Sequence, residues 1–342
     1  MVGTVIVRDG AMVGEAFHAR TGHPHAESLA LAAAGDGARG ATAYVTLEPC
    51  AHHGRTPPCT EALISAGVAR VVACHRDPDP RVAGRGFERL RAAGVMVTVG
   101  MLAEEAIRLN LNYLLPRLLQ RPAVTLKWAM SLDGRIASAA GESQWLSSPA
   151  ARRWALGLRE EHDAILVGIG TVLADDPRLD RRLKRAQGPI LRVVLDRGLR
   201  TPSGARLFGV AGPVRIYTEC ADAARHAALV AAGATIVALP SVTVESVLAD
   251  LFTSGVGSVL VEGGQAVATA FFEAGLFDRV VAVSCGLLLG GSRSPAPLGG
   301  AGRGLASAAR IGPLDARRVG GDVVMTGWNQ GCLRDLLKSA GV

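Results

Sequence analysis

The sequence predicts an α/β protein made of two domains. Its 342 residues are enough for two domains of ordinary size, and 49% of them are apolar, which favours buried cores and excludes a disordered chain. Short apolar strands alternate with helices, and the alternation restarts after the linker Gln120-Arg121-Pro122. We therefore expect one domain at residues 1–120 and a second at residues 121–342.

In the first domain, short apolar runs predict strands, and longer runs with helical spacing predict helices, several of which end at a glycine. The strands are expected at 2–7, 12–18, 43–47, 70–75 and 95–99, and the helices at 25–34, 58–66, 86–93 and 103–119. Asp9-Gly10 is typical of a turn, so the first two strands form a hairpin.

The second domain repeats this alternation with more strands. They are expected at 124–130, 164–168, 191–196, 214–218, 235–239, 258–262 and 279–284, and the helices at 149–161, 221–232, 244–252 and 266–274. The glycine-rich stretch 290–304 predicts a loop. Residues 318–328 predict one last strand, bulged at Gly320-Gly321.

Charge and composition narrow the class of partner. The net charge is +7, and residues 121–342 carry 25 basic against 19 acidic side chains, which favours an anionic partner. Aromatic residues make up only 4%, too few for the stacking surfaces that bind single-stranded nucleic acid, so no nucleic-acid partner is expected. No run of 18 apolar residues occurs, and the first residues read as a strand rather than a signal peptide. We therefore expect a cytoplasmic protein without a membrane partner.

A candidate zinc site comes from His25, Cys50 and Cys59. Six cysteines in a cytosolic chain favour metal binding over disulfides. One histidine and two cysteines leave a fourth zinc position for water, as in a catalytic site, and zinc lowers the pKa of such a water toward about 7. Glu27, two residues after His25, can shuttle protons to a leaving amine. The pattern matches zinc deaminases, except that the second cysteine comes nine residues after the first.

Two simpler interpretations of these residues stay open. Cys50 and Cys59 can be inert thiols at helix ends, and His52 or His53 can replace Cys59 as a ligand. In the second domain, the strand 258–262 runs into Gly263-Gly264 and a helix, which favours binding of an anion at the helix N-terminus. Such a glycine turn can also be a turn only. No dinucleotide fingerprint of the G-x-G-x-x-G type follows a strand.

Longer motifs identify a family. Val45-Thr-Leu-Glu-Pro-Cys-Ala-His-His-Gly-Arg-Thr-Pro-Pro-Cys59 closely resembles the bifunctional deaminase/reductase family of riboflavin biosynthesis. Similar matches are found at residues 77–86, 126–135, 141–145 and 170–177, so the resemblance covers nearly the whole chain. It implies an N-terminal cytidine-deaminase-like α/β/α sandwich followed by a dihydrofolate-reductase-like α/β domain. The implied cofactors are Zn2+ and NADPH.

The resemblance also implies the reactions. The first site deaminates 2,5-diamino-6-ribosylamino-4(3H)-pyrimidinone 5′-phosphate, and the second reduces the ribosyl group to ribityl with NADPH. The partners are therefore small phosphorylated pyrimidines, and a homo-oligomer is expected. Two alternatives are a reductase whose first domain is only a structural zinc module, and a nucleic-acid base deaminase. The reductase-like second half and the few aromatic residues disfavour the latter.

Residue roles follow from the same resemblance. It implies that His25, Cys50 and Cys59 hold zinc, that Glu27 shuttles protons, and that Arg55, with His52 and His53, contacts the first substrate. The NADPH contacts are implied at Ala129, Trp145, Thr171, Asp175, Gly263, Gly264, Gln265, Ala266, Val267 and Ala268. The contacts to the second substrate are implied at Ser143, Arg159, Leu179, Arg182 and Glu262. The proton needed in reduction comes from Lys127 or Asp175, and the sequence leaves both open.

Two departures from the family pattern carry expectations. Family members have an additional helix and a Pro-Asn-Pro-x-Val-Gly segment ahead of the first strand, of which this chain shows only Val2-Gly3. We therefore expect one face of the first sheet to lack a covering helix and deaminase activity to suffer. Asp180 stands where the family usually has Thr or Asn, which places a negative charge near the expected phosphate contact of Arg182.

Overall fold

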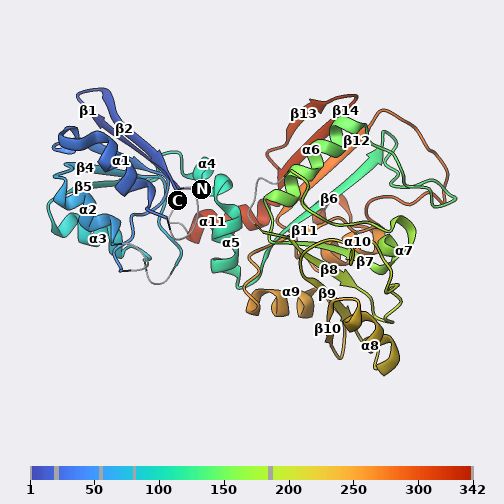
Figure 1. The fold of residues 1–342 in the computed structure, drawn as a ribbon. Helices are drawn as coiled ribbons and strands as arrows, with labels where there is room; N and C mark the ends of the chain where they lie inside the picture. Colours follow the sequence, from blue (N-terminus) through green and yellow to red (C-terminus); the bar gives the residue numbers. More distant parts are fainter. Residues whose placement is uncertain (1, 19–22, 54–56, 80–81, 184–187, 340–342) are drawn as a thin grey trace. The chain divides into compact units, whose positions relative to one another are not determined.

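Each half of the chain folds around its own β-sheet (Figure 1). The computed structural model describes residues 2–18, 23–53, 57–79, 82–183 and 188–339. The contacts divide the chain into a first unit, residues 1–119 with 334–342, and a second unit, residues 120–333. The boundary near the end therefore falls within the last helix, α11 (Gln330–Ser339).

The first unit contains a five-stranded sheet in the order β2-β1-β3-β4-β5. Its strands are β1 (Gly3–Arg8), β2 (Ala11–Phe17), β3 (Thr42–Val45), β4 (Arg70–Ala73) and β5 (Met96–Val99). β1 pairs antiparallel with β2 and β3, whereas β3, β4 and β5 are parallel. Because β3 and β4 are parallel, their carboxyl ends meet at one edge of the sheet, from which the first candidate site is built.

One face of this sheet packs against helices. The helices of the unit are α1 (Ala26–Ala34), α2 (Cys59–Ser65), α3 (Arg85–Ala92), α4 (Ala103–Leu109) and α5 (Leu111–Leu119). Ile6, Ala43 and Val71 from the strands share a buried cluster with residues of α1, α2 and α3. On the opposite face, Tyr44 is 37% exposed and Met96 is 62% exposed. That face is therefore open at these two apolar residues.

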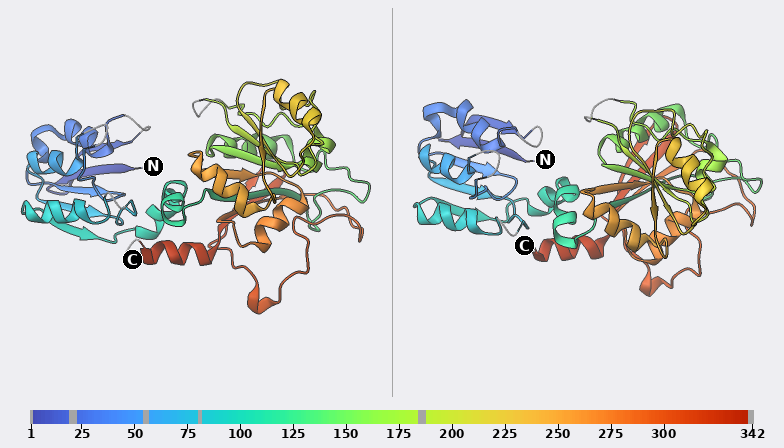
Figure 2. Two further views of the ribbon diagram at one scale, coloured as in Figure 1. Left: turned by 90° about the horizontal axis from the view of Figure 1, so that it is seen from below. Right: turned by 60° about the horizontal axis from the view of Figure 1, so that its bottom comes forward.

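The second unit contains a nine-stranded sheet in the order β10-β9-β8-β7-β11-β6-β12-β14-β13, strongly twisted in Figure 2. Its parallel strands are β6 (Ala123–Ser131), β7 (Ala164–Gly168), β8 (Leu191–Leu195), β9 (Val214–Thr218), β10 (Ala234–Ala238), β11 (Ser258–Val261) and β12 (Arg279–Cys285). The antiparallel end is formed by β13 (Asp315–Val319) and β14 (Asp322–Trp328). β7 is buried at every residue, as expected for a parallel strand covered on both faces.

Helices cover both faces of this sheet. They are α6 (Pro149–Glu160), α7 (Ile169–Asp175), α8 (Ala223–Ala231), α9 (Val244–Thr253) and α10 (Gln265–Glu273). α6 begins at Ser148, whose side chain accepts a hydrogen bond from the Ala151 amide, and Pro149 fits the first helical position. Leu158 of α6 packs with Leu260 and Val281 on one face, whereas α9 and α10 pack on the other.

The strand order creates a switch point at β11. The chain runs from β7 outward to β10, and then returns to insert β11 between β7 and β6. In open α/β sheets, ligands bind at the carboxyl ends of the strands near such a point. The carboxyl ends of β6, β11, β7 and β8 therefore define the place of the second candidate site.

Several sequence predictions are wrong in detail. The single helix expected at 103–119 is two helices, because Asn110 leaves the helical conformation (φ −109°, ψ 12°). The single strand expected at 318–328 is a hairpin, in which Gly320-Gly321 joins β13 to β14. Gly320 has φ +64°, which glycine adopts without strain. The helices α7 and α11 were not predicted at all.

Across the described ranges, no helix is both long enough and apolar enough to cross a membrane.

Candidate active sites

Three metal-binding side chains meet at one edge of the first sheet. His25 directly precedes α1, Cys50 follows β3, and Cys59 is the first residue of α2. Nδ1 of His25 lies 3.1 Å from Sγ of Cys59 and 3.7 Å from Sγ of Cys50. The three ligand atoms all lie within 4.8 Å of one another. The predicted ligands are thus brought together from positions far apart in the sequence.

The spacing fits a tetrahedral zinc ion. Bonds of about 2.3 Å to sulfur and about 2.1 Å to nitrogen place two donor atoms about 3.6–3.8 Å apart at tetrahedral angles. The 3.7 Å separation of His25 and Cys50 agrees with this value, and the 3.1 Å separation of His25 and Cys59 is about 0.5 Å shorter. A hydrogen bond with Cys59 lowers the pKa of Cys50 to about 4, and the same contact raises the pKa of Cys59. Cysteine binds zinc as the thiolate, and Cys50 reaches that form more readily than Cys59.

Glu27 lies beside these ligands in the first turn of α1 and is only 3% exposed. Burial raises its pKa. Its Oε2 atom is buried without a hydrogen-bond partner among the described residues. A buried carboxyl group with one free oxygen is suited to accept or release a proton.

Glu48, two residues before Cys50, organises the neighbouring segment. It is 3% exposed, and its carboxylate accepts hydrogen bonds from four backbone amides, those of Asp77, Gly84, Gly86 and Phe87, at 2.9–3.4 Å. A Cβ atom at Gly86 would lie 2.0 Å from the Pro49 carbonyl oxygen, so only glycine fits there. Residues 84–87 therefore pack directly against the loop that carries Cys50.

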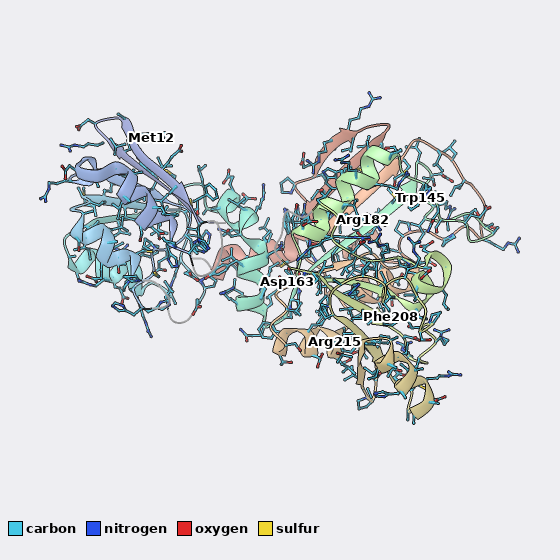
Figure 3. The ribbon with its side chains drawn as sticks, viewed as in Figure 1. Met12, Trp145, Asp163, Arg182, Phe208 and Arg215 are labelled. Atoms are coloured by element: carbon cyan, nitrogen blue, oxygen red, sulfur yellow. The ribbon has the colours of Figure 1, made fainter. Side chains whose placement is uncertain are left out.

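The second unit contains a cleft of about 1400 Å³ at the carboxyl ends of its central strands. Lys127 and Ala129 line it from β6, and Glu262 lies directly after β11. Trp145 and Arg182, both labelled in Figure 3, line it from the segment before α6 and from the loop after α7. Trp145 is 68% exposed, and the guanidinium carbon of Arg152 lies 4.5 Å from its ring centroid.

Glycines allow a close approach of strand and helix beside this cleft. A Cβ atom at Gly263 would lie 2.8 Å from Cβ of Val267 in α10, and one at Gly168 would lie 2.7 Å from Cγ2 of the same side chain. Because both positions are glycine, the N-terminus of α10 packs closely against β7. The turn Glu262-Gly263-Gly264 therefore brings the backbone amides that begin α10 to the cleft, where they suit an anionic group.

A buried ion pair lies inside the cleft. Nη2 of Arg159 lies 2.8 Å from Oε2 of Glu262, and each side chain is 12% exposed. Burial raises the pKa of Glu262, but the positive charges of Arg159 and Lys127 outweigh this effect and lower it to about 2. Glu262 is therefore an anion at neutral pH, suited to accept hydrogen bonds from hydroxyl groups.

Comparison with known proteins assigns both units. The sequence model of the cytidine and deoxycytidylate deaminase zinc-binding region matches residues 1–75, and that of the RibD C-terminal domain matches residues 122–325. The riboflavin biosynthesis protein RibD of Escherichia coli (strain K12) is 41% identical over 338 residues, which cover 95% of this chain and 92% of that protein. RibD of Aquifex aeolicus is 40% identical over 298 residues, covering 87% and 84%.

The chain belongs to the RibD family.

Solved structures agree with this membership. RibD of Acinetobacter baumannii superposes with a TM-score of 0.83 at 37% identity, covering 96% of this chain and 91% of that one. A Thermotoga maritima protein described as a diaminohydroxyphosphoribosylaminopyrimidine deaminase/5-amino-6-(5-phosphoribosylamino)uracil reductase gives a TM-score of 0.83 at 34% identity, with the same coverage. The two expected folds are therefore confirmed.

This RibD chain is a bifunctional enzyme of riboflavin biosynthesis, both deaminase and reductase. Its zinc-binding region contains the His/Cys/Cys cluster, and its reductase domain is of the NADPH-dependent kind. Because both regions match, the bifunctional interpretation is favoured over a reductase with a purely structural first domain.

Only some of the residues predicted for the deaminase site come together in the structure. His52 and His53 do not join the cluster of possible ligands found in the described residues, so the geometry favours Cys59 over either histidine. Arg55 lies outside the described residues. Glu48 was missed, although it lies within the quoted motif. Its position directly before Pro49-Cys50, after an apolar strand, could have indicated its importance for the site.

The residues predicted for the reductase site gather in one place. The cleft is lined by Lys127, Ala129, Ser143, Trp145, Arg159, Thr171, Asp175, Leu179, Arg182, Glu262, Gly263, Gly264, Gln265, Ala266 and Val267. Ala268 does not line the cleft, because this residue of α10 is buried and only 5% exposed. Asp180 pairs with both Arg178 and Arg182 at 2.9 Å, so its carboxylate competes with a phosphate for Arg182.

Proposed function

We propose that His25, Cys50 and Cys59 hold the zinc ion and that Glu27 moves the protons of the deamination. The three ligand atoms lie at distances that suit zinc, and Glu27 is buried beside them with one oxygen unpaired in the described structure. Zinc, when bound, supplies a water of lowered pKa as the nucleophile. Glu27 takes a proton from that water and gives it to the departing amino group, which leaves as ammonia.

The proposed substrate of this first site is 2,5-diamino-6-ribosylamino-4(3H)-pyrimidinone 5′-phosphate. The printed description of the Thermotoga maritima relative supports this class of compound. The contacts of Arg55 with it stay a prediction. The cytoplasmic location and the homo-oligomer expected from the sequence also stay predictions.

In the second site, we propose that Glu262 binds sugar hydroxyls of the substrate and that Arg159 orients Glu262. The buried pair leaves the second carboxylate oxygen of Glu262 for the ligand, because the bond from Arg159 uses Oε2. The N-terminus of α10 takes the pyrophosphate of NADPH. Ala129, Trp145 and Thr171 line the same cleft, which supports their proposed contacts with the cofactor.

The proton for the reduction comes from Lys127 in this proposal. A hydride forms a new C–H bond at C1′ of the ribosyl group, the bond from C1′ to the ring oxygen breaks, and that oxygen takes a proton. Asp175 already accepts hydrogen bonds at Oδ1 from Ser143 and Gln144, both at 3.0 Å, which gives it a positioning task. Lys127 lines the cleft, and its ammonium group has no hydrogen-bond partner among the described residues.

Two variants test whether the two sites act separately. Glu27→Gln keeps the shape of the side chain but cannot shuttle protons, so ammonia release should fall about 10²- to 10⁴-fold. The same variant should reduce the deaminated intermediate at the parent rate and retain zinc. Lys127→Met should show the opposite pattern, with ammonia release unchanged and NADPH oxidation lost. Unchanged ammonia release in the Glu27 variant would contradict the assignment of the first site.

A further inference from the structure

Two arginines on the loop after β8 have no assigned task. The loop runs from residue 196 to 213, and Arg200 and Arg206 both line the reductase cleft from it. Gly198 lies just beyond the end of β8, and a Cβ atom at Gly198 would lie 3.7 Å from Nε of Arg200. The Arg200 side chain therefore folds back over Gly198. Both arginines are exposed.

The loop that carries them is held at several points. Asp196 is fully buried, and its Oδ2 accepts hydrogen bonds from the amide and hydroxyl of Thr201 at 2.7 and 2.8 Å. Asp176 accepts the Arg206 amide at 2.8 Å. The buried Arg192 donates to the carbonyl oxygens of Leu207 and Val210. The arginines therefore project from a preorganised frame, which lowers the entropy cost of binding.

Four other arginines that line the cleft, Arg159, Arg178, Arg182 and Arg197, form ion pairs within the protein. Arg159 pairs with Glu262, and Arg178 and Arg182 share Asp180. Arg197 pairs with Glu219 at 3.3 Å and donates to the Val242 carbonyl. By contrast, no carboxylate in the described ranges pairs with the Arg206 guanidinium. Arg200 approaches only Asp196, with Nε 3.7 Å from Oδ1.

The sheet order places these arginines at the far end of a bound dinucleotide. The proposed hydride end lies at β6 and the pyrophosphate turn at β11, and β7 and β8 follow in the sheet. Three strand spacings separate β6 from β8, about 14 Å. A dinucleotide laid across these carboxyl ends therefore brings its adenosine to the loop after β8.

We propose that Arg200 and Arg206 bind the 2′-phosphate of NADPH and thereby select it over NADH. This inference rests on the proposed reductase site. A 2′-phosphate carries the charge that two guanidinium groups can share through charge-assisted hydrogen bonds. NADH has a hydroxyl at this position and forms no such contact.

Binding of two adenosine fragments tests this directly on the full chain. Titration calorimetry compares 2′,5′-ADP, which carries the 2′-phosphate, with 5′-AMP, which lacks it. Arg200→Ala and Arg206→Ala should each weaken 2′,5′-ADP binding about 10- to 100-fold and change 5′-AMP binding less than about twofold. The ratio of the NADH and NADPH dissociation constants should fall by the same factor. Arg206→Lys, which keeps the charge, should retain part of the preference.

Arg318→Ala is the matched control. Arg318 lies on β13, at the opposite end of the sheet from β8, and is exposed. It should change none of these affinities. Fragment affinities that stay within about twofold in both Arg200→Ala and Arg206→Ala would overturn the proposal, provided that the unaltered chain binds 2′,5′-ADP. If the unaltered chain binds neither NADPH nor 2′,5′-ADP, the reductase assignment fails and the proposal fails with it.

Discussion

Glu262 keeps its negative charge inside the protein because Arg159 and Lys127 lie close to it. Its pKa of about 2 is well below the ordinary value of 4.5, although burial alone would raise it. An isolated buried carboxylate would become neutral, so the ion pair is what maintains an anionic hydrogen-bond acceptor in the cleft. The same pair also means that Arg159 is not a free cation for phosphate.

This pair should produce a defined pH dependence. A carboxylate with a depressed folded pKa stabilises the fold fully above its unfolded pKa, and the contribution is lost as the pH falls toward the folded pKa. The unfolding free energy lost in Glu262→Gln should therefore be constant above about pH 5 and should shrink between about pH 4.5 and 2. Urea denaturation at about pH 5 and pH 3 measures this loss. The same loss at both values would contradict the ion-pair interpretation.

Single residues explain much of what the sequence could predict about the sites. His25, Cys50 and Cys59 follow a recognisable pattern, because zinc chemistry requires those residue types at strand and helix ends. No comparable sequence pattern marks Arg200 and Arg206. Their task depends on where β8 lies in the sheet, which is set by tertiary structure.

At the scale of elements, residues 77–79 and 82–87 show how a loop is held beside the candidate zinc ligands. Glu48 accepts four of its amides, and Tyr113 of α5 donates a hydrogen bond to Asp77 at 3.1 Å. α3 therefore begins at a fixed place relative to Pro49-Cys50. Hydrogen bonds to a charged group are stronger than those between neutral groups, so the loss of the Glu48 carboxylate should cost stability in this segment.

Removing the Glu48 carboxylate should loosen this segment. Glu48→Ala leaves four amides without their acceptor, so hydrogen exchange at Asp77, Gly84, Gly86 and Phe87 should quicken at least about tenfold. Mass spectrometry of exchanged peptides measures this, and Glu88→Ala, an exposed residue of the same helix α3, is the control. Equal exchange in the two variants would show that Glu48 does not hold the segment.

The sequence predicts elements best where they are apolar and bounded by glycine or proline. β7 and β9 were predicted at the observed bounds. β7 is fully buried and forms a continuous apolar run, and β9 directly follows Pro213. α7 was missed because it has seven residues, includes Gly170, and depends on packing of Ile169 and Val172 in the core. The hairpin of β13 and β14 was missed although Gly320-Gly321 is a strong turn signal.

At the scale of the whole molecule, two units with separate sheets carry two chemistries. Residue motifs alone predicted the family because they extend over both units, and both family regions match. The effect of the expected missing helix on deaminase activity stays a prediction.

Ammonia release by the purified, zinc-loaded chain shows whether both active sites work in one protein. The substrate is the diaminopyrimidinone 5′-phosphate, and NADPH is first left out and then added. We expect one ammonia per substrate without NADPH, followed by oxidation of one NADPH per substrate once it is added. No ammonia from soluble, zinc-loaded protein would contradict the account of two working sites in one chain.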